Sequence, residues 1–243
     1  MKRGIKNISL VLLWAGAVAW QGCTTEEETG PSSTLAFTIS YQVDGLPLLF
    51  DTLLYTNDAG NPYSVYKLEY FLTQISLVRL DGSEVIVKDY QYLSAGDPAT
   101  NHFVIENVPE GNFYGIRFNI GVDPAHNVTG GLPNTEDNNN MEWPVPMGGG
   151  YHHMKLEGHF MLHDTLYGFA MHLGKNENLV KVKIMSPVAI NHSNVNYGMV
   201  MNLNEWFRNP SVYDFNTDGN YSMSDTLAMH KLSANGTDVF TRD

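Results

Sequence analysis

Short alternating segments dominate the sequence from Leu35 onward. Leu35, Phe37, Ile39 and Tyr41 alternate with small or polar residues, and Asp44-Gly45 then ends the run. A period of two is typical of a strand that buries one face. Similar segments recur at residues 64–80, 84–93, 102–105, 114–120, 151–162, 166–173, 180–184 and 197–203.

Turn signals separate these segments, for example Asp81-Gly82, Glu110-Gly111 and residues 57–61. Many short strands at this spacing predict an all-β fold, an antiparallel β-sandwich-like single domain over residues 34–243. Between residues 123 and 150 the alternation stops and Gly, Pro and Asn prevail, which predicts a long loop.

One short helix is predicted near the C-terminus. Met223, Leu227, His230 and Ala234 recur at helical spacing. Ser222 or Ser224 would cap the helix, and Asn235-Gly236 would end it.

The N-terminus has the order of a bacterial export signal. Three basic residues precede an apolar run that ends at Gly22-Cys23. We therefore expect a lipoprotein signal peptide over residues 1–22, lipidation at Cys23 and a flexible acidic tether over residues 23–33. The expected location is the outer membrane, on its periplasmic side or at the cell surface, with a lipid anchor.

Charge and cysteine usage exclude several function classes. Loss of residues 1–22 removes three of the 14 basic residues and none of the 26 acidic ones, so the net charge changes from −12 to −15. Such a balance argues against a nucleic-acid partner. Because Cys23 is the only cysteine, lipidation leaves no thiolate for a metal. Two tryptophans remain, Trp143 and Trp206.

Five of the nine histidines lie in one predicted hairpin, residues 150–174. Alternation predicts that His152 is buried, whereas His153 and His159 are exposed. A three-residue turn near residues 163–165 would place His172 on the side of His152, and a two-residue turn would place it with Glu157. The sequence leaves both alternatives open.

A second candidate metal site is a loop near the C-terminus. Its oxygen-bearing residues follow calcium-loop spacing, and the alternative is an Asx-rich turn that caps the last helix. The candidate calcium ligands are Asp214, Asn216, Asp218, Ser222 and Asp225. Motifs for serine, thiol, phosphate-loop or zinc-protease catalysis are absent from the sequence, so we expect a binding protein and not an enzyme.

Several ordered motifs resemble the MbnP-like copper-binding family. They occupy residues 55–60, 67–75, 108–113, 116–123, 127, 141–143, 150–151, 156–158, 172–174 and 235–240. Members of that family are exported and are often encoded with a di-haem cytochrome c peroxidase relative of the MauG type. In characterised members this partner oxidises a tryptophan to kynurenine, which forms a copper site with histidines.

The resemblance implies a copper site, most simply for Cu(I), that contains His172, His152 and Trp143 as kynurenine. His126 and His153 are reserve ligands. Indole offers a metal no lone pair, whereas kynurenine exposes an aniline nitrogen and a carbonyl. The expected roles are copper acquisition or redox handling in the cell envelope. The alternative is a structural or recognition lipoprotein without metal, which binds glycan, peptide or an envelope partner.

The chain departs from the family pattern at residues 144–149, where many relatives carry a second aromatic residue. Met147 in this segment offers a thioether to copper, or packs as an ordinary loop methionine.

Overall fold

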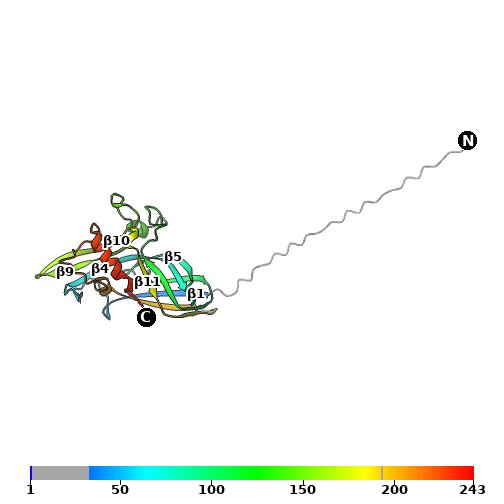
Figure 1. Ribbon diagram of the computed structural model, residues 1–243, viewed down its shortest axis with the longest axis horizontal. Coiled ribbons are helices and arrows are strands. Elements are labelled where there is room, and N and C mark those ends of the chain that lie inside the picture. Colours follow the sequence, from blue (N-terminus) through cyan, green and yellow to red (C-terminus); the bar gives the residue numbers. More distant parts are fainter. Residues whose placement is uncertain (2–32, 193) are drawn as a thin grey trace. The chain divides into compact units, whose positions relative to one another are not determined.

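The computed structural model (Figure 1) describes Met1, residues 33–192 and residues 194–243. Except for Met1, the predicted signal peptide lies outside these residues, as do Cys23 and all of the predicted tether before Ser33. Pro31–Asp243 form a unit of their own, built mainly of strands. Within the described residues, no helix is long and apolar enough to cross a membrane.

One sheet is organised around the first strand. β1 pairs in parallel with β13 along its length, and antiparallel with β6 and β2 near its two ends. β14 pairs antiparallel with β13. The strands of this sheet are β1 (Ser33–Val43), β2 (Leu46–Pro47), β6 (His102–Val108), β13 (Asn194–Asn202) and β14 (Phe240–Arg242).

The larger sheet is organised around one long strand, β4. β9 pairs with the first half of β4 and β8 with the second half. β10 and β11 extend the sheet from β9 and β8, while β3 and β5 also pair with β4. The strands are β3 (Tyr55–Thr56), β4 (Pro62–Val78), β5 (Glu84–Ser94), β8 (Gly115–Ile120), β9 (His152–Leu162), β10 (Thr165–Gly174) and β11 (Val180–Ile184).

The remaining elements are short. β7 (Gly111–Phe113) pairs with β12 (Val188–Ile190). The predicted loop over residues 123–150 contains only α1 (Glu136–Asn140) and the 3-10 turn η1 (Val145–Met147). Three further 3-10 turns are η2 (Asn176–Asn178), η3 (Leu203–Phe207) and η4 (Gly236–Asp238).

The predicted C-terminal helix is present as α2 (Thr226–Asn235), which lies beside β10 (Figure 1). It starts later than the sequence predicted, because Asp225 is its cap and accepts hydrogen bonds from the backbone N–H groups of Leu227 and Ala228. The Ser222 hydroxyl, one of the two predicted caps, is instead bonded to the backbone of His172.

Aromatic side chains join the two large sheets. Phe240 of β14 packs against Tyr70 of β4 and Phe118 of β8, with ring centroids 6.2 and 5.3 Å apart. Beneath the β9–β10 hairpin, Phe169 stacks on Phe215 at 4.7 Å. Buried aromatic pairs of this kind add about 0.5–1.5 kcal/mol beyond the burial of their area. The Phe169–Phe215 pair fixes the position of β10, which pairs with β9. These two strands carry most of the candidate site.

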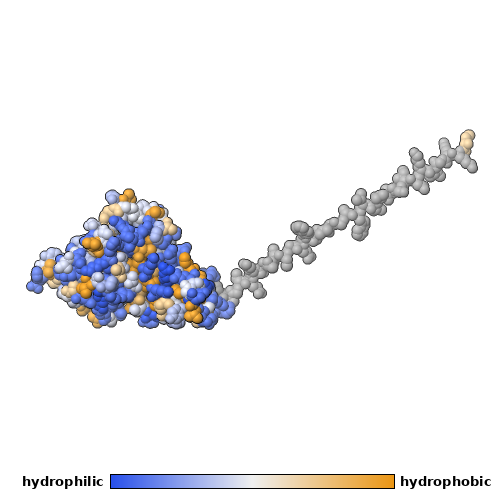
Figure 2. Space-filling model, in the orientation of Figure 1, coloured by the Kyte–Doolittle hydropathy of each residue, from blue (hydrophilic) through white to orange (hydrophobic). Residues whose placement is uncertain are grey.

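The predicted fold class, an all-β sandwich-like domain with a short C-terminal helix, is confirmed. One pairing differs from the antiparallel prediction, since β1 and β13 run parallel. These strands are far apart in sequence, so no tight turn dictates their direction. The visible surface mixes hydrophilic and hydrophobic residues (Figure 2).

Candidate metal centre

The loop before β9 brings Trp143 to the start of that strand. Glu142 and Tyr151 form an isolated antiparallel bridge. The backbone N–H of Trp143 donates to the Gly150 carbonyl at 2.8 Å, and that of His152 donates to the Met141 carbonyl at 2.7 Å. Residues that are nine positions apart in sequence therefore lie side by side.

Three aromatic rings gather at this place. The ring of His152 lies 4.7 Å from that of Trp143 and 5.0 Å from that of His172, with an edge-on angle of 86° to His172. Gly174 adjoins the indole, and a Cβ atom there would lie only 2.4 Å from Trp143 Cε3. The structure thus brings together the three residues that the sequence ranked first.

Only one of the two ring nitrogens of His152 has a hydrogen-bond partner among the described residues. Nδ1 donates to the Met141 carbonyl at 3.1 Å, because a carbonyl oxygen can only accept. Nε2 is buried and has no hydrogen-bond partner among the described residues. Burial, followed by the charges of Lys155 and His172, lowers the pKa of His152 to about 3. The imidazole is therefore neutral, with an unused lone pair on Nε2, which is the state that a metal ligand requires.

His172 is held from two directions. Its Nε2 lies 2.9 Å from Oε1 of Glu157, and the hydrogen bond from His172 lowers the pKa of Glu157 to about 2, against the opposing effect of burial. Its backbone N–H donates to the Ser222 hydroxyl, which in turn donates to the His172 carbonyl, both at 2.7 Å. No hydrogen bond to a described residue engages Nδ1 of His172.

The hairpin contains the two-residue turn. His163 and Asp164 have φ values of 46° and 60°, and Thr165 pairs with Leu162. His172 consequently lies opposite Lys155 and bonds Glu157, as the two-residue alternative predicted. Regular alternation would then separate His172 from His152. A bulge at Leu173/Gly174, where the register skips His153, shifts the alternation and brings the two imidazoles together.

The prediction that His153 is exposed is wrong, because its side chain is fully buried. Gly121, with φ of 120°, provides the space, since a Cβ atom there would lie 2.4 Å from His153 Cγ. Nδ1 accepts from the Val122 N–H at 3.1 Å and Nε2 donates to the Lys175 carbonyl at 2.9 Å. Both nitrogens are used, so His153 has no lone pair left for a metal.

The side chain of the other reserve ligand, His126, contacts a residue outside this cluster. Its Nδ1 is 2.8 Å from Oδ2 of Asp123, and its side chain is 55 % exposed. His159, half-buried on β9, packs against Tyr66 instead.

Trp143 is almost completely buried, and its indole N–H donates to the Met147 carbonyl at 3.3 Å. The backbone of Met147 therefore contacts the indole, whereas its partly buried side chain packs against the core.

The side chains of four of the five candidate calcium residues, Asp214, Asp218, Ser222 and Asp225, form other contacts. Asp218 pairs with Lys231 at 2.6 Å and also accepts from the Asp214 N–H. Asp225 caps α2, and Ser222 bonds the His172 backbone. Asp214 accepts from Asn61 and from the N–H of Asn216. These contacts favour the alternative of a turn that leads into a helix cap.

No three His, Cys, Asp or Glu side chains form a potential metal cage within residues 33–192 and 194–243. Any third ligand to a metal held by His152 and His172 would therefore be of another kind, as far as the described residues go. The residues present suit copper, because copper favours imidazole as a ligand. A bond from copper to Nε2 of His152 would replace the hydrogen bond that this buried nitrogen lacks among the described residues.

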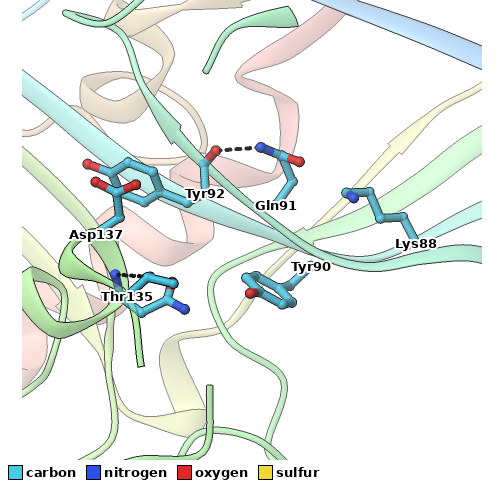
Figure 3. A pocket seen from close by; sticks show the side chains of 7 residues that line it. Lys88, Tyr90, Gln91, Tyr92, Thr135 and Asp137 are labelled. Atoms are coloured by element: carbon cyan, nitrogen blue, oxygen red, sulfur yellow. Dashed lines mark hydrogen bonds between the residues drawn. The ribbon is translucent and has the colours of Figure 1, made fainter. Parts of the chain in front are cut away.

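A separate cleft of about 320 Å³ lies between β5 and α1 (Figure 3). Burial and the nearby carboxylates of Glu69 and Asp137 raise the pKa of Tyr92 in this cleft. Tyr90 and Tyr92 both contact Phe71, which contacts Tyr151 beside His152. The cleft is lined by Lys88, Tyr90, Gln91, Tyr92, Thr135, Asp137 and Asn138.

Fold and site together define a β-sandwich-like protein with a cluster of two histidines and a tryptophan, in which His152 and Trp143 are buried and His172 is half-buried. The chain belongs to the MbnP family, which it matches over residues 32–225. Its structure is similar to that of MbnP from Methylosinus trichosporium, with a TM-score of 0.53, 13 % sequence identity, and coverage of 75 % of this chain and 80 % of that one. The comparison with curated proteins found no match.

Proposed function

We propose that this protein is an exported lipoprotein that binds copper, as Cu(I), through His152 and His172, and that it is not an enzyme. The observation that carries the proposal is the buried Nε2 of His152, which lies beside a second imidazole and has no hydrogen-bond partner in the described part of the chain. Leaving a buried polar atom unsatisfied costs about 1–3 kcal/mol, and a metal bond would remove that cost. Membership of the MbnP family supports copper as the metal.

Trp143 would complete the site after oxidation to kynurenine by a di-haem peroxidase-like partner. Two molecules of peroxide, each reduced to water, would supply the two oxygen atoms that open the indole to N-formylkynurenine, and hydrolysis by one water would then release formate. The new aniline nitrogen and carbonyl would arise from a ring 4.7 Å from His152, in contrast to the indole N–H, which can only donate. Copper acquisition or redox handling in the cell envelope is the role we assign to such a site.

Copper titration of the purified protein tests the ligands. We expect one Cu(I) per chain in competition with a chromophoric chelator, and a loss of at least about 100-fold in affinity in His152→Ala and in His172→Ala. His230→Ala, at an exposed position on α2, is the matched control and should bind as the unsubstituted protein does. Less than stoichiometric copper, or unchanged affinity in His172→Ala, would contradict the proposal.

The modification has its own test. Intact mass after co-expression with the partner should rise by about 4 Da, the net gain of one oxygen and loss of one carbon, and the change should map to Trp143. An unchanged mass at Trp143 under these conditions would exclude kynurenine from the site.

The tyrosine-lined cleft supports a second candidate function, a recognition lipoprotein without metal. Aromatic rings beside an amide and charged groups suit a glycan or a peptide. Under this alternative, Tyr90→Ala would abolish binding in a glycan and peptide array, while copper binding would be absent.

A further inference from the structure

Glu157 contacts His172 and is itself held from two other sides. Its Oε1 accepts from His172 Nε2 at 2.9 Å and lies 3.8 Å from Nζ of Lys67. Its Oε2 accepts from the Tyr66 hydroxyl at 2.9 Å. The Glu157 side chain is only 16 % exposed. The carboxylate therefore has a defined position relative to the imidazole.

An ionised carboxylate can only accept, so its contact places the proton of neutral His172 on Nε2 and the lone pair on Nδ1. His152 shows the complementary arrangement, since the Met141 carbonyl places its proton on Nδ1 and its lone pair on Nε2. Each imidazole thus has one nitrogen assigned as a donor by an oxygen and one left with a lone pair, on rings whose centres are 5.0 Å apart.

We infer that Glu157 is the positioning residue for His172, which holds this imidazole as the Nε2–H tautomer and makes Nδ1 the nitrogen that binds copper. The inference rests on the proposed function. Without the carboxylate, the ring loses the contact that selects its tautomer and orientation. Outer partners of this kind typically change metal affinity by about 10–100-fold.

Tyr66 limits the rotation of the carboxylate. Its hydroxyl holds the oxygen that does not contact His172, and its ring packs against His159 at 5.3 Å. Tyr66→Phe should therefore weaken copper binding by less than Glu157→Ala does, because the His172 contact itself remains.

Nitrogen NMR of the labelled, metal-free protein reports the tautomer directly. We expect His172 as Nε2–H in the unsubstituted protein and a mixture of tautomers in Glu157→Ala. Cu(I) affinity of this variant should fall about 10–100-fold. Glu157→Gln retains one acceptor oxygen and should lie between the two. Glu84→Ala, which removes a carboxylate paired with Arg117 in the same sheet, is the matched control and should change neither readout.

Different results would contradict the copper-binding proposal and the positioning role of Glu157. Absence of copper binding by the unsubstituted protein would overturn the proposed function. An Nδ1–H tautomer at His172, or an unchanged tautomer and affinity in Glu157→Ala, would overturn the positioning role of Glu157 even if copper binds. Thermal unfolding of each variant verifies that the fold is retained.

Discussion

Gly174 provides the most direct test of the packing around Trp143. The backbone of Gly174 does not have a positive φ, so alanine is tolerated conformationally and the substitution adds only a methyl group. That methyl carbon would lie 2.4, 2.6 and 2.9 Å from three indole atoms, where ordinary contacts are about 3.5–4.0 Å. The indole must therefore move by about 1 Å or more, or the strand must shift.

Overpacking of this kind costs about 1–3 kcal/mol. We expect Gly174→Ala to lower the free energy of unfolding by this amount in urea titrations followed by tryptophan fluorescence. Because the indole also contacts His152, we expect copper affinity to fall at least about 10-fold, since small displacements of positioned groups are costly.

Gly168→Ala is the matched control on the same strand. Its added methyl would lie 3.4 Å from the Tyr221 hydroxyl, which lies at the end of an exposed side chain. Stability should change by less than about 0.5 kcal/mol, as for other surface substitutions. If Gly174→Ala and Gly168→Ala were equally stable and bound copper equally, the indole would not be packed against Gly174 as described.

Three further predictions concern stability. Burial lowers the pKa of His153 from 6.5 to about 4, so the unfolded state binds more protons between these values. Because of this residue, the free energy of unfolding of the metal-free protein should fall by about 3 kcal/mol as the pH is lowered from 7 to 4. In urea titrations, His153→Gln should lose this share of the pH dependence. An unchanged pH dependence in His153→Gln would contradict the prediction. Ser222→Ala should cost about 1–3 kcal/mol in the same assay, because it leaves the N–H of His172 without its acceptor, and a neutral result would mean that water replaces the hydroxyl. Asp225→Ala should cost about 1 kcal/mol through loss of the α2 cap, equally with and without calcium, whereas a calcium-dependent loss would support the calcium-loop prediction.

The histidine-rich hairpin shows how far the sequence could predict the site. The sequence singled out His152, His172 and Trp143 as candidates. It also predicted that His152 is buried, and the structure confirms this burial. It also offered the two-residue turn that joins His172 to Glu157. It could not predict the bulge in which His153 is the extra residue. One extra residue turns the following side chains to the other face of the strand, and nothing in the local sequence indicates it.

The burial of His153 could not be predicted from the sequence, because it depends on groups that are distant in the chain. Its burial requires the missing side chain at Gly121, and its two hydrogen bonds go to the backbone of Val122 and Lys175. Alternation along β9 alone therefore gave the wrong prediction. Ser222 is similar, since its hydroxyl is bonded to the backbone of a residue fifty positions away and not to the helix it precedes.

By itself the sequence determined the all-β class, the C-terminal helix and the family, because strand periodicity, turn residues and ordered motifs are local properties of the chain. The tertiary structure alone decided the parallel pairing of β1 with β13, the meeting of His152 with His172, and which imidazole nitrogen retains a lone pair. These features depend on register, bulges and hydrogen bonds between distant segments. The local sequence pattern limits which residues can contribute to the site, and the tertiary contacts decide which of them lie together.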